Sequence, residues 1–408
     1  MNILYLTYDG LTDTLGQSQI IPYLAGLSSK GHQIIIISFE KKNKFEKLSS
    51  EIKNVLDENQ IKWIPLHYHY FPPVLSSVYD VLRLKTVSRK IVQKEKIDIV
   101  HCRSYITALV GLHLKKKLKI KFIFDMRGFW ADERIDGNLW NLKNPIYKKI
   151  YSYFKQKEKE FFNQADCVVS LTDKGKNIIQ EQSVNQNYIE VIPCCVDTVL
   201  FSKKNIQPDK EKYFRNLLKI DEQDFIISYL GSLGTWYLPD EMMKFFRLFL
   251  NKSENAKFMF ITPDSHETVF SYSDKYNIPK EKIIVIASER KNVPVLLSFS
   301  RLSLFFIKPL FSKSASSPTK MAEALSMGIP IICNAGIGDN DKIITESGAG
   351  LVIKDFSDES LQEAVDKTNS LISLSEDAIR KTAIDIFSLE KGVENYHKIY
   401  TRLGEIKS

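Results

Sequence analysis

Two successive series of short, β-branched runs, separated by longer amphipathic stretches, constrain the fold of this chain more than any other feature. Runs of this kind are typical of strands buried on both faces, and the stretches between them suit the helices that connect parallel strands. The chain has 408 residues, which fits two domains of roughly 200 residues each. The sequence therefore predicts an α/β protein with two doubly wound domains.

The expected elements divide the chain into two parts. The first series of strands covers residues 2–7, 32–38, 61–66, 98–103, 121–126, 167–172 and 189–193, with helices near 16–30, 75–95, 105–117, 144–164 and 173–182. The second covers residues 225–231, 257–262, 282–287, 302–308, 330–335 and 350–354. A polar join lies around 195–222, and a last helix over about 388–405 either caps the second domain or returns to the first.

Composition and charge exclude several classes of protein. The first ten residues read as a strand rather than a signal peptide, and no apolar run approaches the roughly 18 residues that span a bilayer. Five cysteines without metal-ligand spacing are expected to be buried thiols in a reducing cytoplasm. The net charge of +8 comes partly from clusters at 41–44 and 115–121. These are either a solvated surface or a face held against anionic lipid headgroups or acidic substrates, and no motif indicates nucleic acid.

The most informative stretch is SKSASSPTKMAEALSMGIPIICNAGIGD at 312–339. Ser317 as the N-cap and Pro318 at the first helical position predict the start of a helix. We expect this helix to run to about Met327 and to end at Gly328, before the strand at 330–335.

One side of this expected helix is apolar and another carries candidate chemistry. The side that suits packing on the sheet contains Met321, Ala324, Leu325 and Gly328. Thr319, Lys320 and Glu323 share a different side. The first amides of the helix and the charge of Lys320 suit a phosphate, and Glu323 can accept hydrogen bonds from two ribose hydroxyls. The alternative is an ordinary capped helix with a solvated Lys320–Glu323 pair.

This stretch resembles the donor-binding segment of retaining GT-B glycosyltransferases, especially glycosyltransferase family 4. Further matching segments are YDGLTDTLGQSQIIPYLAGLSSKGHQI, VIPCCVDTVLF, GLVI and FSLEKGVENYHKIY. The resemblance implies two Rossmann-like domains facing across a cleft: an acceptor-side domain at 1–200 and a donor-side domain at 201–385. It also implies that the helix in 386–408 crosses back to the N-terminal domain.

The same resemblance implies an activity. The chain is expected to move a sugar from a nucleotide-sugar donor to the hydroxyl of a saccharide or lipid-linked acceptor, with retention and without metal or other cofactor. A role in surface polysaccharide or glycoconjugate synthesis is implied, in the cytoplasm or peripherally on the inner face of the membrane. Two alternatives stay open, a GT-B sugar-nucleotide epimerase and a catalytically silent sugar-nucleotide-binding protein. A dehydrogenase is disfavoured because no G-x-G-x-x-G follows the first strand of either half.

The donor-binding residues of the family match this chain only in part. Glu323 matches the second glutamate of the family's two-glutamate signature, which binds the ribose, whereas Ala315 stands where the first glutamate should be. The family's Gly-Arg pair and following lysine are also missing after the strand at 225–231. There Gly231, Ser232 and Gly234 still permit close approach of a phosphate, or serve only the turn. The candidates for replacing the missing cations are Lys320, Lys308 and Arg290.

The N-terminal half contributes a loop and a strand end. Gly16 lies in GQSQ, expected between the first strand and its helix, where the resemblance implies contact with the donor phosphate and a simple turn is the alternative. Asp125 and Arg127 come at the carboxyl end of a strand, where open α/β sheets bind ligands. We take them as the candidate catalytic residues, with Arg127 neutralising the leaving diphosphate or holding an acidic sugar or acceptor. The alternative is a structural ion pair of Arg127 with Asp125, Asp132 or Glu133.

Two further motifs are interpreted as structural. His101 ends the preceding strand and is expected to be a packed histidine. Asp339-Asn340-Asp341 has the Asp-x-Asp spacing of metal-dependent glycosyltransferases, but it follows a glycine-rich loop, and we interpret it as a solvated loop. No metal site is therefore predicted.

Overall fold

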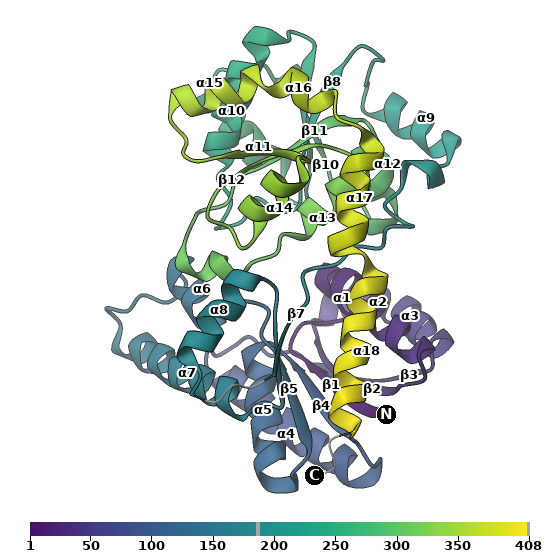
Figure 1. Ribbon diagram of the computed structural model, residues 1–408, viewed down its shortest axis with the longest axis vertical. Helices are drawn as coiled ribbons and strands as arrows, with labels where there is room; N and C mark the ends of the chain where they lie inside the picture. Colours follow the sequence, from purple (N-terminus) through teal and green to yellow (C-terminus); the bar gives the residue numbers. More distant parts are fainter. Residues whose placement is uncertain (185–187, 406–408) are drawn as a thin grey trace. The chain divides into compact units, whose positions relative to one another are not determined.

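The computed structural model describes residues 1–184 and 188–405, which cluster in two units (Figure 1). The first unit contains Met1–Pro193, Ser314–Ser316 and the chain from Leu389 onward. The second contains Cys194–Lys313 and Ser317–Ser388. The change of unit at Pro193 comes earlier than the expected boundary at residue 200. The sequence did not indicate that Ser314–Ser316 cluster with the first unit.

Within the described residues, the first unit is built on a seven-stranded parallel sheet of order β3-β2-β1-β4-β5-β6-β7. Its strands are β1 (Asn2–Thr7), β2 (Gln33–Glu40), β3 (Ile61–His67), β4 (Ile99–Arg103), β5 (Lys121–Asp125), β6 (Cys167–Ser170) and β7 (Tyr188–Val191). Its central strands are buried runs of branched side chains, and Ile3 of β1 pairs with Ile34 of β2 and Ile99 of β4. Strand order reverses between β1 and β4, the kind of position at which doubly wound sheets bind ligands.

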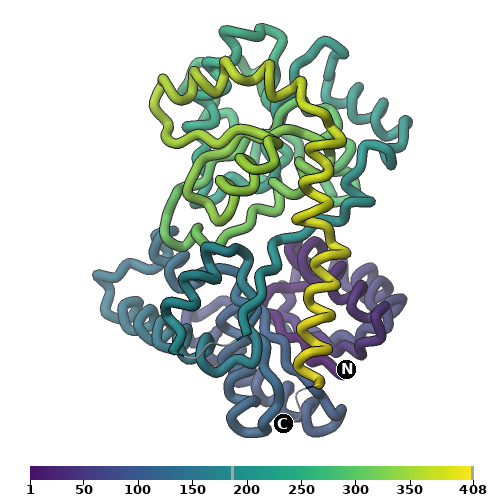
Figure 2. Tube along the Cα trace, in the orientation of Figure 1, coloured from purple at the N-terminus to yellow at the C-terminus, as the bar shows by residue number. Residues whose placement is uncertain are grey.

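The helices of the first unit are α1 (Thr14–Gln19), α2 (Ile21–Ser29), α3 (Lys42–Glu58), α4 (Leu75–Lys94), α5 (Ser104–Leu118), α6 (Trp130–Asp136), α7 (Pro145–Gln164), α8 (Asp173–Gln182) and α18 (Leu389–Glu405). The basic cluster at 41–44 opens α3, a helix that the sequence analysis did not predict. The last helix, α18, packs against α2 and so returns to the first unit (Figure 2, yellow beside purple).

The described part of the second unit holds a six-stranded parallel sheet of order β10-β9-β8-β11-β12-β13. Its strands are β8 (Phe225–Leu230), β9 (Ala256–Ile261), β10 (Ile283–Ile286), β11 (Ser300–Phe305), β12 (Ile331–Asn334) and β13 (Gly350–Ile353). Its helices are α9 (Pro208–Leu217), α10 (Pro239–Lys252), α11 (His266–Lys275), α12 (Val293–Ser298), α13 (Thr319–Ser326), α14 (Asn340–Ser347), α15 (Asp358–Asp366), α16 (Thr368–Ile372) and α17 (Glu376–Phe387). Short 3-10 turns occupy Lys203–Asn205, Lys280–Lys282, Arg290–Asn292 and Phe311–Ala315.

These elements confirm the predicted fold class. Each expected strand is present within a few residues of its predicted bounds, and both sheets are parallel. The five cysteines are buried thiols, as predicted. Among the helices that the structure describes, none combines the length and the apolar character needed to cross a bilayer.

Candidate functional site

The strand order of the second sheet reverses between β8 and β11. The predicted donor residues gather beyond the carboxyl ends of these strands. Gly231 directly follows β8, Lys308 follows β11, and α13 precedes the neighbouring strand β12. Ligands of open α/β sheets bind at such a switch point.

Helix α13 begins one residue later than predicted, at Thr319, and Ser317 has another partner. Its hydroxyl accepts a hydrogen bond from the backbone amide of Cys194 (3.2 Å), and Pro318 takes the N-cap position without a side-chain cap. The prediction that Ser317 caps the helix is therefore wrong. The end of α13 agrees better with the expectation, since Gly328 adopts the left-handed conformation (φ +71°) typical of a helix terminus.

Helix α13 is buried around its circumference. Met321, Ala324 and Leu325 are in the core, which confirms the predicted sheet-facing side. Lys320 and Glu323 are also buried, with only 7% and 4% of their surfaces exposed. The alternative of a solvated Lys320–Glu323 pair is therefore excluded.

Lys320 is a buried cation that faces aromatic rings. Its Nζ lies 4.0 Å from the ring centroid of Tyr229 and 3.6 Å from that of Tyr237. Within the described chain this ammonium has no hydrogen-bond partner. Burial lowers the pKa of Lys320 well below its usual value, although Glu323 and Asp264 act in the opposite direction. An ammonium group in such a position is typical of a site that receives an anion.

Gly231 leaves open the space beside this ammonium. It has φ +104°, and a Cβ at this position would lie 3.4 Å from Lys320 Nζ. Glycine is therefore favoured by the backbone conformation, and a side chain here would contact the lysine. The predicted residues Gly231 and Lys320 are thus brought together, although they are far apart in the sequence.

The turn after β8 is held by a residue that sequence reasoning missed. Asp264 Oδ2 accepts hydrogen bonds from the Leu233 amide (2.5 Å) and from Thr262 Oγ1 (2.8 Å). Tyr229 donates to the carbonyl of Ser232 (2.7 Å), and Gly234 has φ +34°. The available signal was the position of Asp264 just after the expected strand at 257–262.

Glu323 is paired with Arg290 rather than with Lys320. Arg290 Nη1 lies 2.6 Å from Glu323 Oε1, and the guanidinium stacks 5.0 Å above the Phe201 ring. Arg290 therefore orients the carboxylate instead of standing as a separate cation for a phosphate. A carboxylate has about four acceptor positions, so Glu323 retains acceptor capacity beside this bond.

The remaining donor candidates, Thr319 and Lys308, are only partly buried. Thr319 is the first residue of α13 and is partly exposed. Lys308 is partly exposed as well, and its backbone amide donates to the carbonyl of Trp236 (2.8 Å). No hydrogen bond or ion pair of the Lys308 side chain with Glu323, Lys320 or Arg290 occurs in the described structure.

In the first unit, Gly16 lies inside α1 and not in an open loop, which corrects the predicted position. A Cβ at Gly16 would lie 2.3 Å from the carbonyl oxygen of Gly10. Glycine is required here because the preceding loop crosses the helix closely. That loop is held by Glu40, a buried residue that sequence reasoning missed, which accepts from the Leu11 amide (2.7 Å) and the Thr12 hydroxyl (2.6 Å).

Asp125 and Arg127 meet at the end of β5. Arg127 Nη1 lies 3.9 Å from Asp125 Oδ1, so the pair named as the structural alternative is present. Asp125 is almost fully buried, and it accepts a hydrogen bond from Tyr396 of α18 (3.1 Å). Burial opposes the ionisation of Asp125, but Arg127, His101 and Arg103 outweigh it and hold its pKa below the usual value. Arg127 has φ +61°, which is uncommon for a residue with a side chain and often marks a functional position.

The two motifs interpreted as structural lie in different surroundings. His101 is buried and bonded through Nδ1 to Tyr400 Oη (2.7 Å), which confirms a packed histidine. The Asp-x-Asp segment is not a solvated loop, because Asn340 is buried and begins α14 while Asp341 accepts from the Gly336 amide (3.1 Å). No cluster of three or more His, Cys, Asp or Glu suited to a metal ion exists among the described residues.

Ala315 packs in the core of the first unit. Its methyl group faces Gly175, where an added Cβ would approach the Cβ of Ala315 to 2.9 Å. The neighbouring Ser314 carbonyl accepts a hydrogen bond from Thr172 (2.9 Å). A glutamate at position 315 would have to enter this core, which accounts for the alanine.

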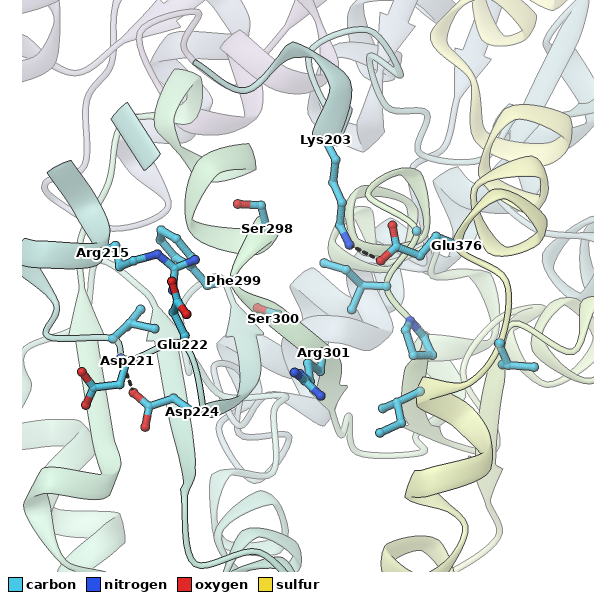
Figure 3. A pocket seen from close by; sticks show the side chains of 16 residues that line it. Lys203, Arg215, Asp221, Glu222, Asp224, Ser298, Phe299, Ser300, Arg301 and Glu376 are labelled. Atoms are coloured by element: carbon cyan, nitrogen blue, oxygen red, sulfur yellow. Dashed lines mark hydrogen bonds and ion pairs between the residues drawn. The ribbon is translucent and has the colours of Figure 1, made fainter. Parts of the chain in front are cut away.

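A large cavity lies away from these residues. It has a volume of about 400 Å³ and lies at the amino ends of β8, β11 and β12 (Figure 3). Several of its charges are paired, as in Lys203–Glu376 (2.6 Å), and Arg215 stacks on Phe299 (5.0 Å). It contains none of the predicted donor residues, and we assign no ligand to it.

Comparison with known proteins identifies what the chain resembles. Residues 21–200 match the family model of Glycosyltransferase Family 4, and residues 209–383 match that of Glycosyl transferases group 1. The UDP-Gal:alpha-D-GlcNAc-diphosphoundecaprenol alpha-1,3-galactosyltransferase of Escherichia coli is 24% identical over 338 residues, which cover 76% of this chain and 77% of that protein.

Solved structures share the architecture. A glycosyltransferase from Rickettsia africae superposes with a TM-score of 0.73 at 18% identity, covering 100% of this chain and 99% of that one. HepE of Anabaena in complex with UDP and glucose has a TM-score of 0.69 at 10% identity, covering 98% and 99%. At these identities the likeness concerns the fold.

Proposed function

The chain belongs to the GT-B glycosyltransferases of the family 4 type, and from this membership we propose how it acts. It moves a sugar from a nucleotide diphosphate to an acceptor hydroxyl with retention of configuration. The observation that carries the donor assignment is the buried ammonium of Lys320 beside Gly231. A diphosphate supplies the negative charge that this ammonium lacks.

Each end of the donor has a candidate partner in the second unit. Lys320 and the first amides of α13 bind the diphosphate and stabilise the charge that grows on it as the sugar leaves. Glu323, oriented by Arg290, accepts hydrogen bonds from the ribose hydroxyls. The carbon–oxygen bond to the diphosphate breaks, the acceptor oxygen bonds to the same carbon, and the acceptor proton passes to the departing diphosphate.

Arg127 is our candidate in the first unit for binding a negatively charged part of a substrate. Asp125 is buried beneath it, so we propose that Asp125 positions Arg127 and does not itself react. Of the two residues expected to be catalytic, Arg127 therefore keeps a role in contacting substrate, and Asp125 has a positioning role.

The Escherichia coli relative supports a proposal for the substrate class. Its name specifies a UDP-galactose donor and an acceptor linked through diphosphate to undecaprenol. We propose a UDP-sugar donor and a lipid-linked saccharide acceptor in surface polysaccharide synthesis. We propose that the reaction takes place in the cytoplasm, and the five buried thiols support this proposal.

This proposal can be tested with a panel of nucleotide sugars. We expect one UDP-sugar to raise the melting temperature, because a ligand that binds only the folded state stabilises it. Nucleotide should then be released only when a lipid-linked acceptor is added, and NMR should show the anomeric configuration of the donor in the product. Activity should persist in EDTA, because Lys320 and the α13 amides supply the charge stabilisation. Release of nucleotide without acceptor would contradict sugar transfer, and a product of inverted configuration would contradict retention. A loss of activity in EDTA that Mg²⁺ restores would contradict metal independence.

Donor binding should also depend on pH through Lys320. Its pKa is lowered in the donor-free protein and is raised by a bound diphosphate. Between these two pKa values the free lysine is neutral and must take up a proton, so affinity falls as pH rises, by at most about tenfold per pH unit. Tyr229, Tyr237, Glu323 and Asp264 are the other titratable groups that face the ammonium.

Calorimetry in two buffers of different protonation enthalpy measures this proton uptake directly. We expect the observed binding enthalpy of UDP to differ between the buffers, and the difference to disappear in Lys320→Met. A wild-type enthalpy that is the same in both buffers across the alkaline range would refute the coupling.

A further inference from the structure

Helix α4 of the first unit exposes apolar side chains in its first turns, where the fully buried positions are polar. The buried positions along the whole helix are Ser76, Asp80, Leu84 and Ser88, and four partly buried apolar residues, Val81, Val87, Ile91 and Val92, also pack against the core. The first turns expose an apolar ridge to solvent, formed by Leu75, Val78, Tyr79 and Leu82. Just before the helix, Tyr70 and Phe71 are 79% and 77% exposed. A surface helix normally buries such side chains, so this ridge indicates an apolar partner.

Hydrogen bonds prevent α4 from rotating to bury the ridge. Asp80 is fully buried and accepts from Tyr8 Oη (2.9 Å). Its other carboxylate oxygen lies 2.6 Å from Nδ1 of His69. Turning the helix would break these bonds and leave a buried carboxylate unpaired, which is costly. The exposed ridge is therefore a fixed feature of the fold.

Positive charge adjoins the ridge. Lys85 and Arg89 of α4 and Lys117 of α5 form a basic cluster around His113, whose pKa is lowered by burial and by these three cations. The two helices pack against each other (Figure 1). In the described chain no ion pair neutralises Lys85, Arg89 or Lys117. The cluster connects the basic segment at 115–121 with the apolar ridge.

We infer that the apolar ridge and the basic cluster dock this protein on an anionic lipid bilayer. Apolar and aromatic side chains that enter the headgroup region next to lysine and arginine are the chemistry of interfacial binding. A second copy of the chain fits less well. A twofold contact would place one ridge against the other and bring the two basic clusters close, where they repel.

The docking surface rests on the proposed function in one respect, because a lipid-linked acceptor is met at the bilayer surface. The donor site is in the second unit, so nucleotide binding in solution does not depend on α4. Failure of the docking surface and failure of the donor site can therefore be told apart.

Vesicle co-sedimentation tests the surface. The full chain should bind phosphatidylcholine vesicles that contain phosphatidylglycerol, and bind pure phosphatidylcholine more weakly. Leu75→Ser/Leu82→Ser should lower vesicle affinity by at least about tenfold. Lys85→Gln/Arg89→Gln should remove the preference for the anionic vesicles and its salt dependence.

A matched control lies in the second unit. Tyr213 and Leu217 of α9 are about as exposed as the ridge residues, and Tyr213→Ser/Leu217→Ser should bind vesicles like the wild type. All variants should keep the wild-type melting temperature and UDP affinity. The inference is overturned if the wild type does not bind anionic vesicles, or if the ridge variant binds them as tightly as the wild type. Wild-type dimers that the ridge variant abolishes, without vesicle binding, overturn it in favour of self-association.

Discussion

Replacing Lys320 by methionine is expected to lower kcat/KM for the nucleotide sugar by about a hundredfold to a thousandfold, the usual effect of removing one group that stabilises developing negative charge. The loss should appear in kcat as well as in KM, because charge on the leaving diphosphate increases in the transition state. Steady-state kinetics measure kcat and KM, with the donor that the panel of nucleotide sugars identifies.

The same variant should be at least as stable as the wild type. Methionine has a similar length and packs well on aromatic rings such as those of Tyr229 and Tyr237. It also removes a buried amino group that has no hydrogen-bond partner in the described chain. Each 1 kcal/mol gained raises the melting temperature by about 2–4 °C in a domain of this size. Lower activity with higher stability is a combination that a merely structural lysine does not produce.

Lys252 provides the matched control in the same unit. Its Nζ donates to the carbonyls of Val365 (2.9 Å) and Asp366 (3.0 Å), so it ties α10 to α15. Lys252→Met should lower the melting temperature and leave kcat/KM unchanged. If kcat/KM of Lys320→Met stays within about threefold of the wild type, the diphosphate assignment is wrong.

Replacing Glu323 by glutamine is expected to weaken UDP binding by about tenfold to a hundredfold, since hydrogen bonds to a charged group contribute about 1.5–3 kcal/mol. The glutamine amide keeps one acceptor, but its NH₂ group must face either Arg290 or the ribose. Both arrangements lose at least one favourable hydrogen bond. Calorimetric titration with UDP measures the change.

Comparison of UDP with 2′-deoxy-UDP locates the effect on the ribose. The wild type should bind the deoxy nucleotide more weakly than UDP, whereas Glu323→Gln should bind the two almost equally. This cycle cancels any general effect of the substitution on the second unit. Glu363→Gln, on the exposed side of α15, should behave like the wild type. A variant that discriminates between the two nucleotides as strongly as the wild type would remove Glu323 from the ribose site.

Sequence patterns were sufficient for the fold because they are local. Branched apolar runs such as the one at Ile34–Ile37 are typical of strands buried on both faces, and the intervening lengths suit parallel crossovers. The core side of α13 follows in the same way from helical periodicity. The cap of that helix did not follow, because the Ser317 hydroxyl bonds to Cys194, which is distant in the sequence.

The candidate site was only partly accessible from the sequence. The residue types and the glycine-containing turn at 231–234 were recognised, and Lys320 and Glu323 were placed on one helix. Sequence could not show that Arg290 holds Glu323, or that Asp264 holds the turn. Those contacts depend on how β8, β9, α13 and the turn after β10 are brought together by the sheet.

The amino-acid sequence by itself determined two parallel α/β domains and the helix that carries Lys320 and Glu323, because periodicity and turn residues act over short distances. Only the tertiary structure decided that Lys320 is buried against Tyr229 and Tyr237 with no hydrogen-bond partner in the described chain. It also decided that α4 keeps Asp80 inside while Leu75 and Leu82 are exposed. Whether a polar group is paired or an apolar one covered depends on the surfaces that packing brings together, and a local pattern does not contain that information.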